Sequence, residues 1–127
     1  MEKQIIVTTD APAPIGPYSQ AVLAGPFLFI SGQVAINPAT GNIEATDIRL
    51  ETKQVMSNLK AILEKAGTDF SSIVKTTIFL TDMAQFADVN EVYSAYFNSD
   101  FPARETVAVK GLPKNVNVEI SMTAYLK

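Results

Sequence analysis

The sequence predicts an α+β fold in which two helices cover one face of a β-sheet. Strand-like segments rich in β-branched residues, such as 72–81, are separated by two segments whose apolar residues recur at helical spacing. The predicted order is strands, helix, strand, helix and two strands. The strands at 27–30 and 72–81 are apolar on both sides, although two helices can cover only one face. We therefore expect another subunit to cover the second face.

The first third of the chain is expected to hold three strands. Residues 3–7 predict a short strand, and residues 8–19 predict a stiff extended loop, because they contain three prolines and a glycine. Gly25 and Pro26 separate two apolar runs and therefore predict a hairpin. The segment NPATG at 37–41 predicts a second turn.

Two helices are expected, each beginning at an aspartate that can cap it. Asp47 precedes a segment that runs to about Ala66, and Gly67 follows as its stop signal. The apolar face of this helix consists of Val55, Leu59, Ile62 and Ala66. Asp82 precedes the second helix, predicted at about 84–98. Its buried side is predicted to hold Phe86, Val89, Val92 or Tyr93, Tyr96 and Phe97.

The last two strands are expected to form a hairpin, with 104–111 and 116–126 joined by the turn LPKN. When apolar positions are matched across the pair, Arg104 shares a sheet face with Glu119, about 13 Å away along the strands. The same face then carries Thr106, Asn117 and Ser121. If this face meets another subunit, an arginine without an obvious partner there is suited to bind an anion such as a substrate carboxylate.

The amino-acid composition argues against several kinds of catalytic and metal site. The chain has 127 residues without a repeat or linker, so we expect a single domain over residues 1–127. It has no cysteine and no histidine, which leaves zinc sites and Ser-His-Asp or Cys-His catalysis without their usual groups. The net charge of −3 argues against nucleic acid or an anionic membrane as a partner. The lack of a long apolar run or a signal-peptide core predicts a cytoplasmic protein.

Five segments in this order resemble the Rid family of reactive intermediate deaminases, in particular its RidA or YjgF-like branch. They are APAPIGPYSQAV (11–22), FISGQVAINPATG (29–41), residues 74–97, FPARETVAV (101–109) and LPKNVNVEISMTAY (112–125). The resemblance implies a chorismate-mutase-like fold with a six-stranded, mostly antiparallel sheet. It also implies a homotrimer with its sites in the clefts between subunits. The implied activity is that of a 2-iminobutanoate/2-iminopropanoate deaminase, which hydrolyses imines and enamines such as 2-aminoacrylate to 2-keto acids and ammonia without a cofactor or metal.

The resemblance also assigns roles to individual residues. Arg104 matches the arginine that binds the substrate carboxylate, and Glu119 matches the glutamate that positions the attacking water. Further positions implied to contact substrate are Tyr18, Ser31, Gly32, Asn90 and Thr106. The chain departs from the family pattern at three places: Thr106 stands where many relatives have cysteine, Glu105 where serine is common, and Ser121 where some have a second glutamate. Strand alternation predicts that Glu105 points away from Arg104.

Other interpretations stay open at this stage. Arg104 could form a structural ion pair at a subunit interface, and Glu119 could be a solvated strand carboxylate. A trimer that binds small carboxylates without turnover would use the same arginine. An endoribonuclease or translation inhibitor is disfavoured by the negative charge and by the absence of histidine. A deaminase dedicated to one catabolic pathway would differ only in its pocket lining.

Overall fold

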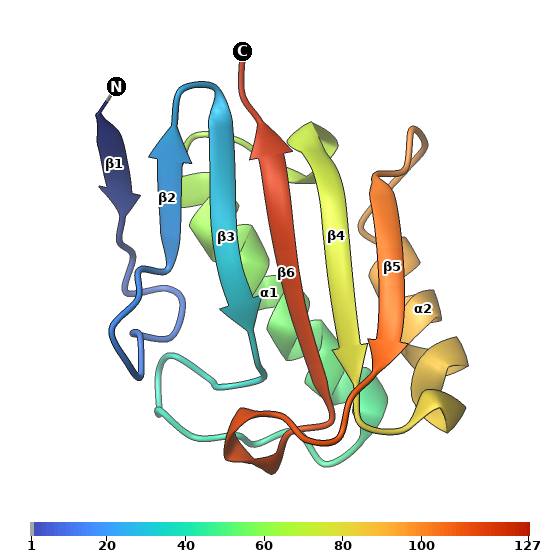
Figure 1. Ribbon diagram of the computed structural model, residues 1–127. Coiled ribbons are helices and arrows are strands. Elements are labelled where there is room, and N and C mark those ends of the chain that lie inside the picture. Colours follow the sequence, from blue (N-terminus) through green and yellow to red (C-terminus); the bar gives the residue numbers. More distant parts are fainter. Residues whose placement is uncertain (1) are drawn as a thin grey trace.

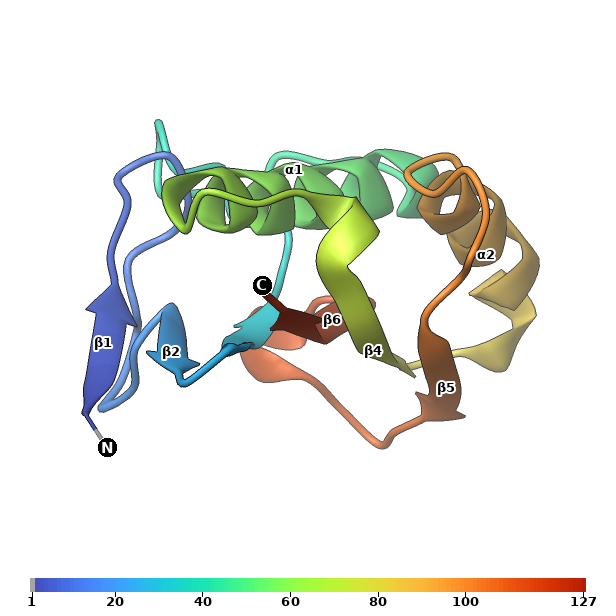
Figure 2. The same ribbon diagram turned by 90° about the horizontal axis from the view of Figure 1, so that it is seen from above.

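The computed structural model describes residues 2–127 and shows a six-stranded sheet with two helices packed on one face (Figures 1 and 2). The strands are β1 Lys3–Ile6, β2 Ala21–Ala24, β3 Phe27–Gln33, β4 Ile73–Leu80, β5 Ala103–Ala108 and β6 Val118–Tyr125. The helices are α1 Ile48–Lys65 and α2 Phe86–Ser94, and short 3₁₀ turns are η1 Phe70–Ser72, η2 Met83–Gln85 and η3 Pro113–Asn115. The spatial order of the strands is β1-β2-β3-β6-β4-β5. The predicted α+β fold is confirmed.

The N-terminal predictions are confirmed. Strands β2 and β3 form the predicted antiparallel hairpin around Gly25, which has a φ of 60°, and β1 pairs with the outer edge of β2. The predicted turn at 37–41 is closed by the N–H of Gly41, which donates to the carbonyl of Asn37 at 2.7 Å. The side chain of Gln20 holds the proline-rich loop against the sheet.

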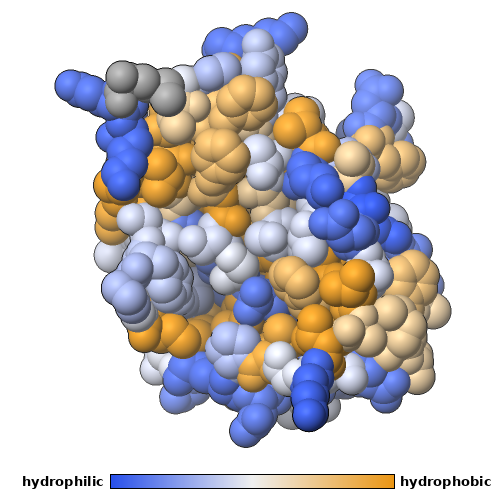
Figure 3. Space-filling view, viewed as in Figure 1, coloured by the Kyte–Doolittle hydropathy of each residue, from blue (hydrophilic) through white to orange (hydrophobic). Residues whose placement is uncertain are grey.

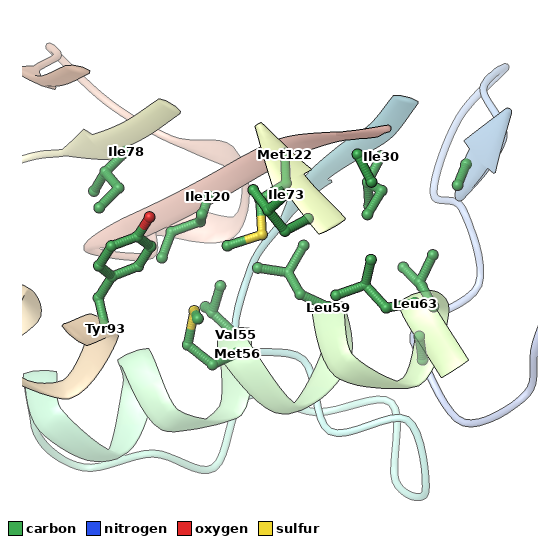
Figure 4. Packing of buried hydrophobic residues seen from close by; sticks show 14 of the residues in the cluster. Ile30, Val55, Met56, Leu59, Leu63, Ile73, Ile78, Tyr93, Ile120 and Met122 are labelled. Atoms are coloured by element: carbon green, nitrogen blue, oxygen red, sulfur yellow. The ribbon is translucent and has the colours of Figure 1, made fainter. Parts of the chain in front are cut away.

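Helix α1 forms as its caps and apolar spacing predict. The carboxylate of Asp47 accepts a hydrogen bond from the N–H of Leu50 at 2.8 Å, and Gly67 follows the helix with a φ of 80°. The face of α1 that meets the sheet is fully buried and packs against residues of β3, β4 and β6 (Figure 4). Its members are Val55, Met56, Leu59, Ile62 and Leu63.

Helix α2 is shorter than predicted at both ends. Asp82 does act as a cap, but its carboxylate accepts from the N–H of Ala84 and closes the 3₁₀ turn η2, so the α-helix begins only at Phe86. After Ser94 the chain continues with bonds between residues three apart, as from the N–H of Phe97 to the carbonyl of Ser94. The tighter turn still packs against the core, because the ring of Phe97 lies 4.9 Å from that of Tyr93.

The predicted C-terminal hairpin is wrong. Strand β5 pairs with β4 in parallel, and β6 lies between β3 and β4, antiparallel to both (Figure 1). The physical reason lies in burial. Alternate residues of β6 are fully buried, which suits a central strand with neighbours on both sides, whereas β5 is exposed along most of its length and takes the edge.

This topology also overturns the predicted arrangement of Arg104 and Glu119. Residues directly paired across a sheet project to the same face. Arg104 pairs with Thr76, which is buried beneath the helices, so Arg104 and Thr106 project to the helix side. Glu119 alternates with the buried residues of β6 and projects to the opposite, open face. In one protomer the guanidinium and the carboxylate therefore lie on opposite faces of the sheet.

The open face of the sheet carries apolar side chains that residues 2–127 leave exposed. The rings of Phe27 and Phe29 are 40% and 50% exposed, and Tyr125 packs edge-on against Phe27 with ring centroids 5.3 Å apart. Figure 3, which views this face, shows apolar groups spread among polar ones across it. That another subunit covers this face stays a prediction. No helix in residues 2–127 combines the length and apolar character of a membrane-spanning segment.

Candidate functional site

One pocket, which we call the glutamate pocket because Glu119 lines it, opens at the end of β3 beside the proline-rich loop. It has a volume of about 390 Å³. Its lining residues are Ile15, Tyr18, Ser31, Gly32, Val34, Pro113 and Glu119. The structure therefore brings together four of the predicted site residues, Tyr18, Ser31, Gly32 and Glu119, although they come from three separate parts of the chain.

Hydrogen bonds tie the proline-rich loop, residues 8–19, to the sheet and so place Tyr18 at this pocket. The buried amide group of Gln20 donates to the carbonyls of Thr8, Ala11 and Pro12, and its oxygen accepts from the N–H of Thr8 at 2.8 Å. The hydroxyl of Ser31 donates to the carbonyl of Ser19 at 2.6 Å. Ser31 thus has a structural bond as well as a place in the pocket wall.

Gly32 lets the carboxylate of Glu119 lie directly on the backbone of β3. A Cβ atom at position 32 would stand 2.8 Å from Cδ of Glu119 and would also collide with its Oε2. The pairing of β3 with β6 shifts register between Ile30 and Gln33, which is a bulge next to this contact. No side chain larger than glycine fits here unless the carboxylate moves.

Burial raises the pKa of Glu119 above the ordinary value of a glutamate. The carboxylate is half-buried on the open side of the sheet, and in the part of the chain described by the structure it forms no ion pair. Its neighbours across the sheet are Gly32 and Phe79, which carry no charge. A carboxyl group in such a setting can exchange a proton closer to neutral pH than an exposed one can.

A second pocket, which we call the arginine pocket because Arg104 lines it, lies between α2 and the start of β5. It has a volume of about 310 Å³. Its lining residues are Asn90, Tyr93, Ser94, Phe101, Pro102 and Arg104. Arg104 donates from one guanidinium nitrogen to the side-chain oxygen of Asn90 at 2.7 Å. Asn90, a predicted site residue, therefore acts on Arg104 directly.

Aromatic rings hold the guanidinium in place without neutralising it. The central carbon of the Arg104 guanidinium lies 5.3 Å from the ring centroid of Tyr93 and 5.6 Å from that of Phe86. Among residues 2–127 no carboxylate pairs with it. The Tyr93 hydroxyl donates to Thr76 at 2.9 Å, and burial raises the pKa of Tyr93. The cation therefore keeps its charge and its open edge for a ligand.

Thr106 lies on the same side of β5 as Arg104 but lines neither pocket. Its hydroxyl oxygen is buried and has no hydrogen-bond partner among residues 2–127. Thr106 therefore forms no side-chain hydrogen bond with the other site residues of the described chain.

Glu105 points away from Arg104, as predicted. Its carboxylate pairs with the ammonium group of Lys75 at 3.1 Å and accepts from the hydroxyl of Thr77 at 2.9 Å, both on the open face. The hydrogen bond from Thr77, followed by those from Lys75, lowers the pKa of Glu105. The acidic residue at this position therefore does not neutralise the guanidinium of Arg104.

Sequence reasoning missed the supports of both pockets. Phe86 and Tyr93 were predicted only as core residues, although with Asn90 they recur at i, i+4 and i+7 and so form one face of α2 towards Arg104. That spacing was a usable signal. The sequence around Gln20 gives no such signal, because the hydrogen-bond partners of this side chain lie up to 12 residues away in an irregular loop. In residues 2–127 no cluster of three acidic, histidine or cysteine side chains could hold a metal ion.

The chain is similar to known proteins over nearly its whole length. The family model described as endoribonuclease L-PSP matches residues 8–126. A RutC family protein of Pyrococcus horikoshii is 53% identical over 123 residues, which are 97% of this chain and 98% of the relative. The human 2-iminobutanoate/2-iminopropanoate deaminase is 44% identical over 122 residues, covering 96% of this chain and 89% of that protein.

Solved structures of related proteins also match this chain over nearly its whole length. The crystal structure of E. coli TdcF with bound serine superposes with a TM-score of 0.93 at 41% identity, covering 98% of this chain and 99% of that one. Because the family model spans nearly the whole chain and relatives share about half of its residues over their full length, the chain belongs to the Rid family, the YjgF/RidA-type proteins.

Proposed function

We propose that this protein is a hydrolytic deaminase that converts 2-imino acids and their enamine tautomers to 2-keto acids and ammonia. The observation that carries the proposal is the pair of unsatisfied groups: an arginine held by neutral side chains, and a half-buried carboxylate without an ion-pair partner. The first suits a substrate carboxylate and the second suits proton transfer. The name of the human relative supports the same reaction.

The chemistry needs few groups. Arg104 takes the substrate carboxylate through two parallel N–H···O bonds, which orient the C=N carbon. The carboxylate of Glu119 holds a water molecule and accepts its proton as the water oxygen bonds to that carbon. The proton passes to the nitrogen, which gives a carbinolamine. Glu119 then relays the hydroxyl proton of the carbinolamine to the nitrogen, the C–N bond breaks, and ammonia leaves as the carbonyl forms. An enamine first gains a proton at carbon, which the raised pKa of Glu119 allows that carboxyl group to supply.

The proposed site requires two protomers. Arg104 and Glu119 project to opposite faces of one sheet, so a site that contains both must take each from a different copy. The exposed apolar rings of Phe27, Phe29 and Tyr125 favour packing of copies through the open face. We propose a closed homotrimer, in which the arginine pocket of one subunit meets the glutamate pocket of the next.

The direct test is a coupled assay in which a threonine dehydratase supplies 2-iminobutanoate. We expect Arg104→Ala and Glu119→Gln each to lose most of their activity. Arg49→Ala is the matched control, because Arg49 is the only other arginine and its guanidinium pairs with Asp88 and Glu91 on the helical surface. Full turnover in both Arg104→Ala and Glu119→Gln would overturn the proposal.

Mixing the two inactive variants tests whether sites are shared. If each site takes Arg104 from one subunit and Glu119 from the next, each mixed trimer contains one intact site in three. Equal mixing after dissociation should then recover about a quarter of the wild-type activity. Mixtures that remain inactive, although they exchange subunits, would contradict the shared site.

Binding without turnover is the second candidate function, and the serine bound in the E. coli relative favours it. The same arginine pocket would serve. Measuring keto-acid affinity and imine turnover on one preparation separates the two functions. An endoribonuclease activity, as in the description of the family model, is disfavoured by the net charge of −3 and by the lack of histidine.

A further inference from the structure

One acidic side chain lies in the interior and belongs to neither pocket. Glu51, in the first turn of α1, is only 4% exposed. Carboxylates are rarely buried unless they are paired, yet no lysine or arginine of residues 2–127 forms an ion pair with it. Its place near the helix N-terminus favours negative charge. The remaining compensation comes from N–H groups of Asn117 and Val118, where β6 begins.

Three N–H donors at the start of β6 converge on the carboxylate of Glu51. One oxygen accepts from the backbone N–H groups of Asn117 and Val118, at 2.8 and 3.1 Å. The other oxygen accepts from the side-chain amide of Asn117 at 2.8 Å. These bonds span 66 and 67 residues of sequence and join the helix layer to the residue before β6 and to the first residue of that central strand.

The anchored residues come directly before Glu119. Val118 is the first residue of β6, and the side chain of Glu119 has no ion-pair partner in residues 2–127 that could set its position. Two things therefore determine where its carboxylate lies: the backbone of β6, and the contact with Gly32 that leaves no spare room. A shift of the strand start would move the carboxylate with it.

We propose that Glu51 is a positioning residue, which fixes the start of β6 so that the carboxylate of Glu119 is held against Gly32 in the glutamate pocket. The proposal rests on the function proposed above for Glu119. Glu51 does not touch the substrate. It acts through three hydrogen bonds on the backbone that carries the reacting group.

The central variant is Glu51→Leu, which removes both acceptor oxygens and leaves a branched apolar side chain in the buried position. We expect kcat to fall about 10²-fold, because a displacement of about 1 Å in a reacting group has this effect. KM should stay nearly unchanged, because the arginine pocket lies on the other face of the sheet. Leu63→Ala is the control: it destabilises the same helix at its far end, away from both pockets, and should leave kcat and the pH profile unchanged.

Charge rearrangement within the pair gives a rescue test. Asn117→Asp places two carboxylates against each other and should impair kcat. Adding Glu51→Gln restores a donor and an acceptor: the new amide accepts from the two backbone N–H groups and donates to the new aspartate. We expect the double variant to recover kcat to within a few-fold of wild type. A double variant no more active than Asn117→Asp, with wild-type stability, would contradict the proposal.

A second readout follows Glu119 itself. Release of the strand start should expose its carboxyl group, so its NMR titration and the acid limb of kcat should move to lower pH in Glu51→Leu. Apart from Glu119, the only titratable side chain lining the glutamate pocket is Tyr18, and the neighbouring strands present Gly32 and Phe79. A change in stability alone would not move this titration.

The outcomes separate the two proposals. If Glu119→Gln is fully active, the catalytic role proposed for Glu119 fails, while the NMR titration of Glu119 in the Glu51 variants still decides the positioning role. If Glu119→Gln is inactive but Glu51→Leu keeps the wild-type kcat and titration, the positioning role is overturned and the function stands. If Glu51→Leu does not fold, the Asn117→Asp and Glu51→Gln pair decides.

Discussion

Replacing Gly32 with alanine should greatly reduce turnover while leaving the fold intact. The new Cβ atom would stand 2.8 Å from Cδ and 3.0 Å from Cγ of Glu119. Carbon atoms in contact normally lie about 3.5–4.0 Å apart. The Glu119 side chain must therefore retreat by about 1 Å, away from the place where the backbone of β3 now supports its carboxylate.

The two consequences differ greatly in size. The free energy of unfolding should change by less than about 1 kcal/mol, because two effects nearly cancel. An off-rotamer glutamate destabilises the fold by about 0.5–1.5 kcal/mol, and the loss of glycine flexibility in the unfolded chain stabilises it by about 0.4–1 kcal/mol. Turnover should fall about 10²-fold, because the reacting carboxylate is displaced by about 1 Å. Affinity for a keto acid at Arg104 should persist.

The assay pairs imine turnover with thermal unfolding. Gly111→Ala is the matched control, because a Cβ atom there would meet nothing within 4 Å and its φ is not positive. It should leave turnover unchanged. The reasoning is refuted if Gly32→Ala turns over imine at the wild-type rate, or if its activity falls only as far as its folded fraction does.

Three further predictions follow from the geometry. Burial raises the pKa of Glu119, so the folded state binds the proton of this group more tightly than the unfolded chain does, and its ionisation destabilises the fold as pH rises from the ordinary to the raised pKa. Glu119→Gln should therefore raise Tm at neutral pH and have no such effect below the ordinary pKa of glutamate. An unchanged Tm at pH 7 would refute this. Tyr93→Phe keeps the ring beneath Arg104 but removes the 2.9 Å hydrogen bond to Thr76. Urea unfolding should show that the free energy of unfolding falls by about 1 kcal/mol, while KM stays unchanged. A tenfold rise in KM would instead show that the hydroxyl positions the guanidinium. Gln20→Ala removes four hydrogen bonds of the proline-rich loop and should cost on the order of 3 kcal/mol, with faster proteolysis of residues 8–19; cleavage at the wild-type rate would contradict this role.

Local signals predicted the elements of this fold well. The caps at Asp47 and Asp82, the stop at Gly67 and the break at Gly25 all act within a few residues, and the structure has an element boundary at each of them. The second helix was predicted too long because the same cap can close a 3₁₀ turn, and apolar spacing does not distinguish the two.

For the candidate site, the sequence indicated individual residues but not their grouping. Tyr18, Ser31, Gly32 and Glu119 line one pocket, while Asn90 joins Arg104 in another. The hydrogen bond between Glu51 and Asn117 joins residues far apart in sequence, and the support of Arg104 by Phe86 and Tyr93 crosses from α2 to β5. No local pattern records the first of these contacts, because it exists only once the helix layer lies on the sheet.

The sequence by itself determined which elements form, which faces of them are apolar, and which chemistry is open to a chain without histidine or cysteine. Only the tertiary structure decided the neighbours of the last two strands, and with them the faces on which Arg104 and Glu119 lie. The physical reason is that two adjacent strands and a short turn are compatible with a hairpin. Burial over the whole sheet instead favours β6 at the centre, where its apolar side chains are covered, and the exposed β5 at the edge.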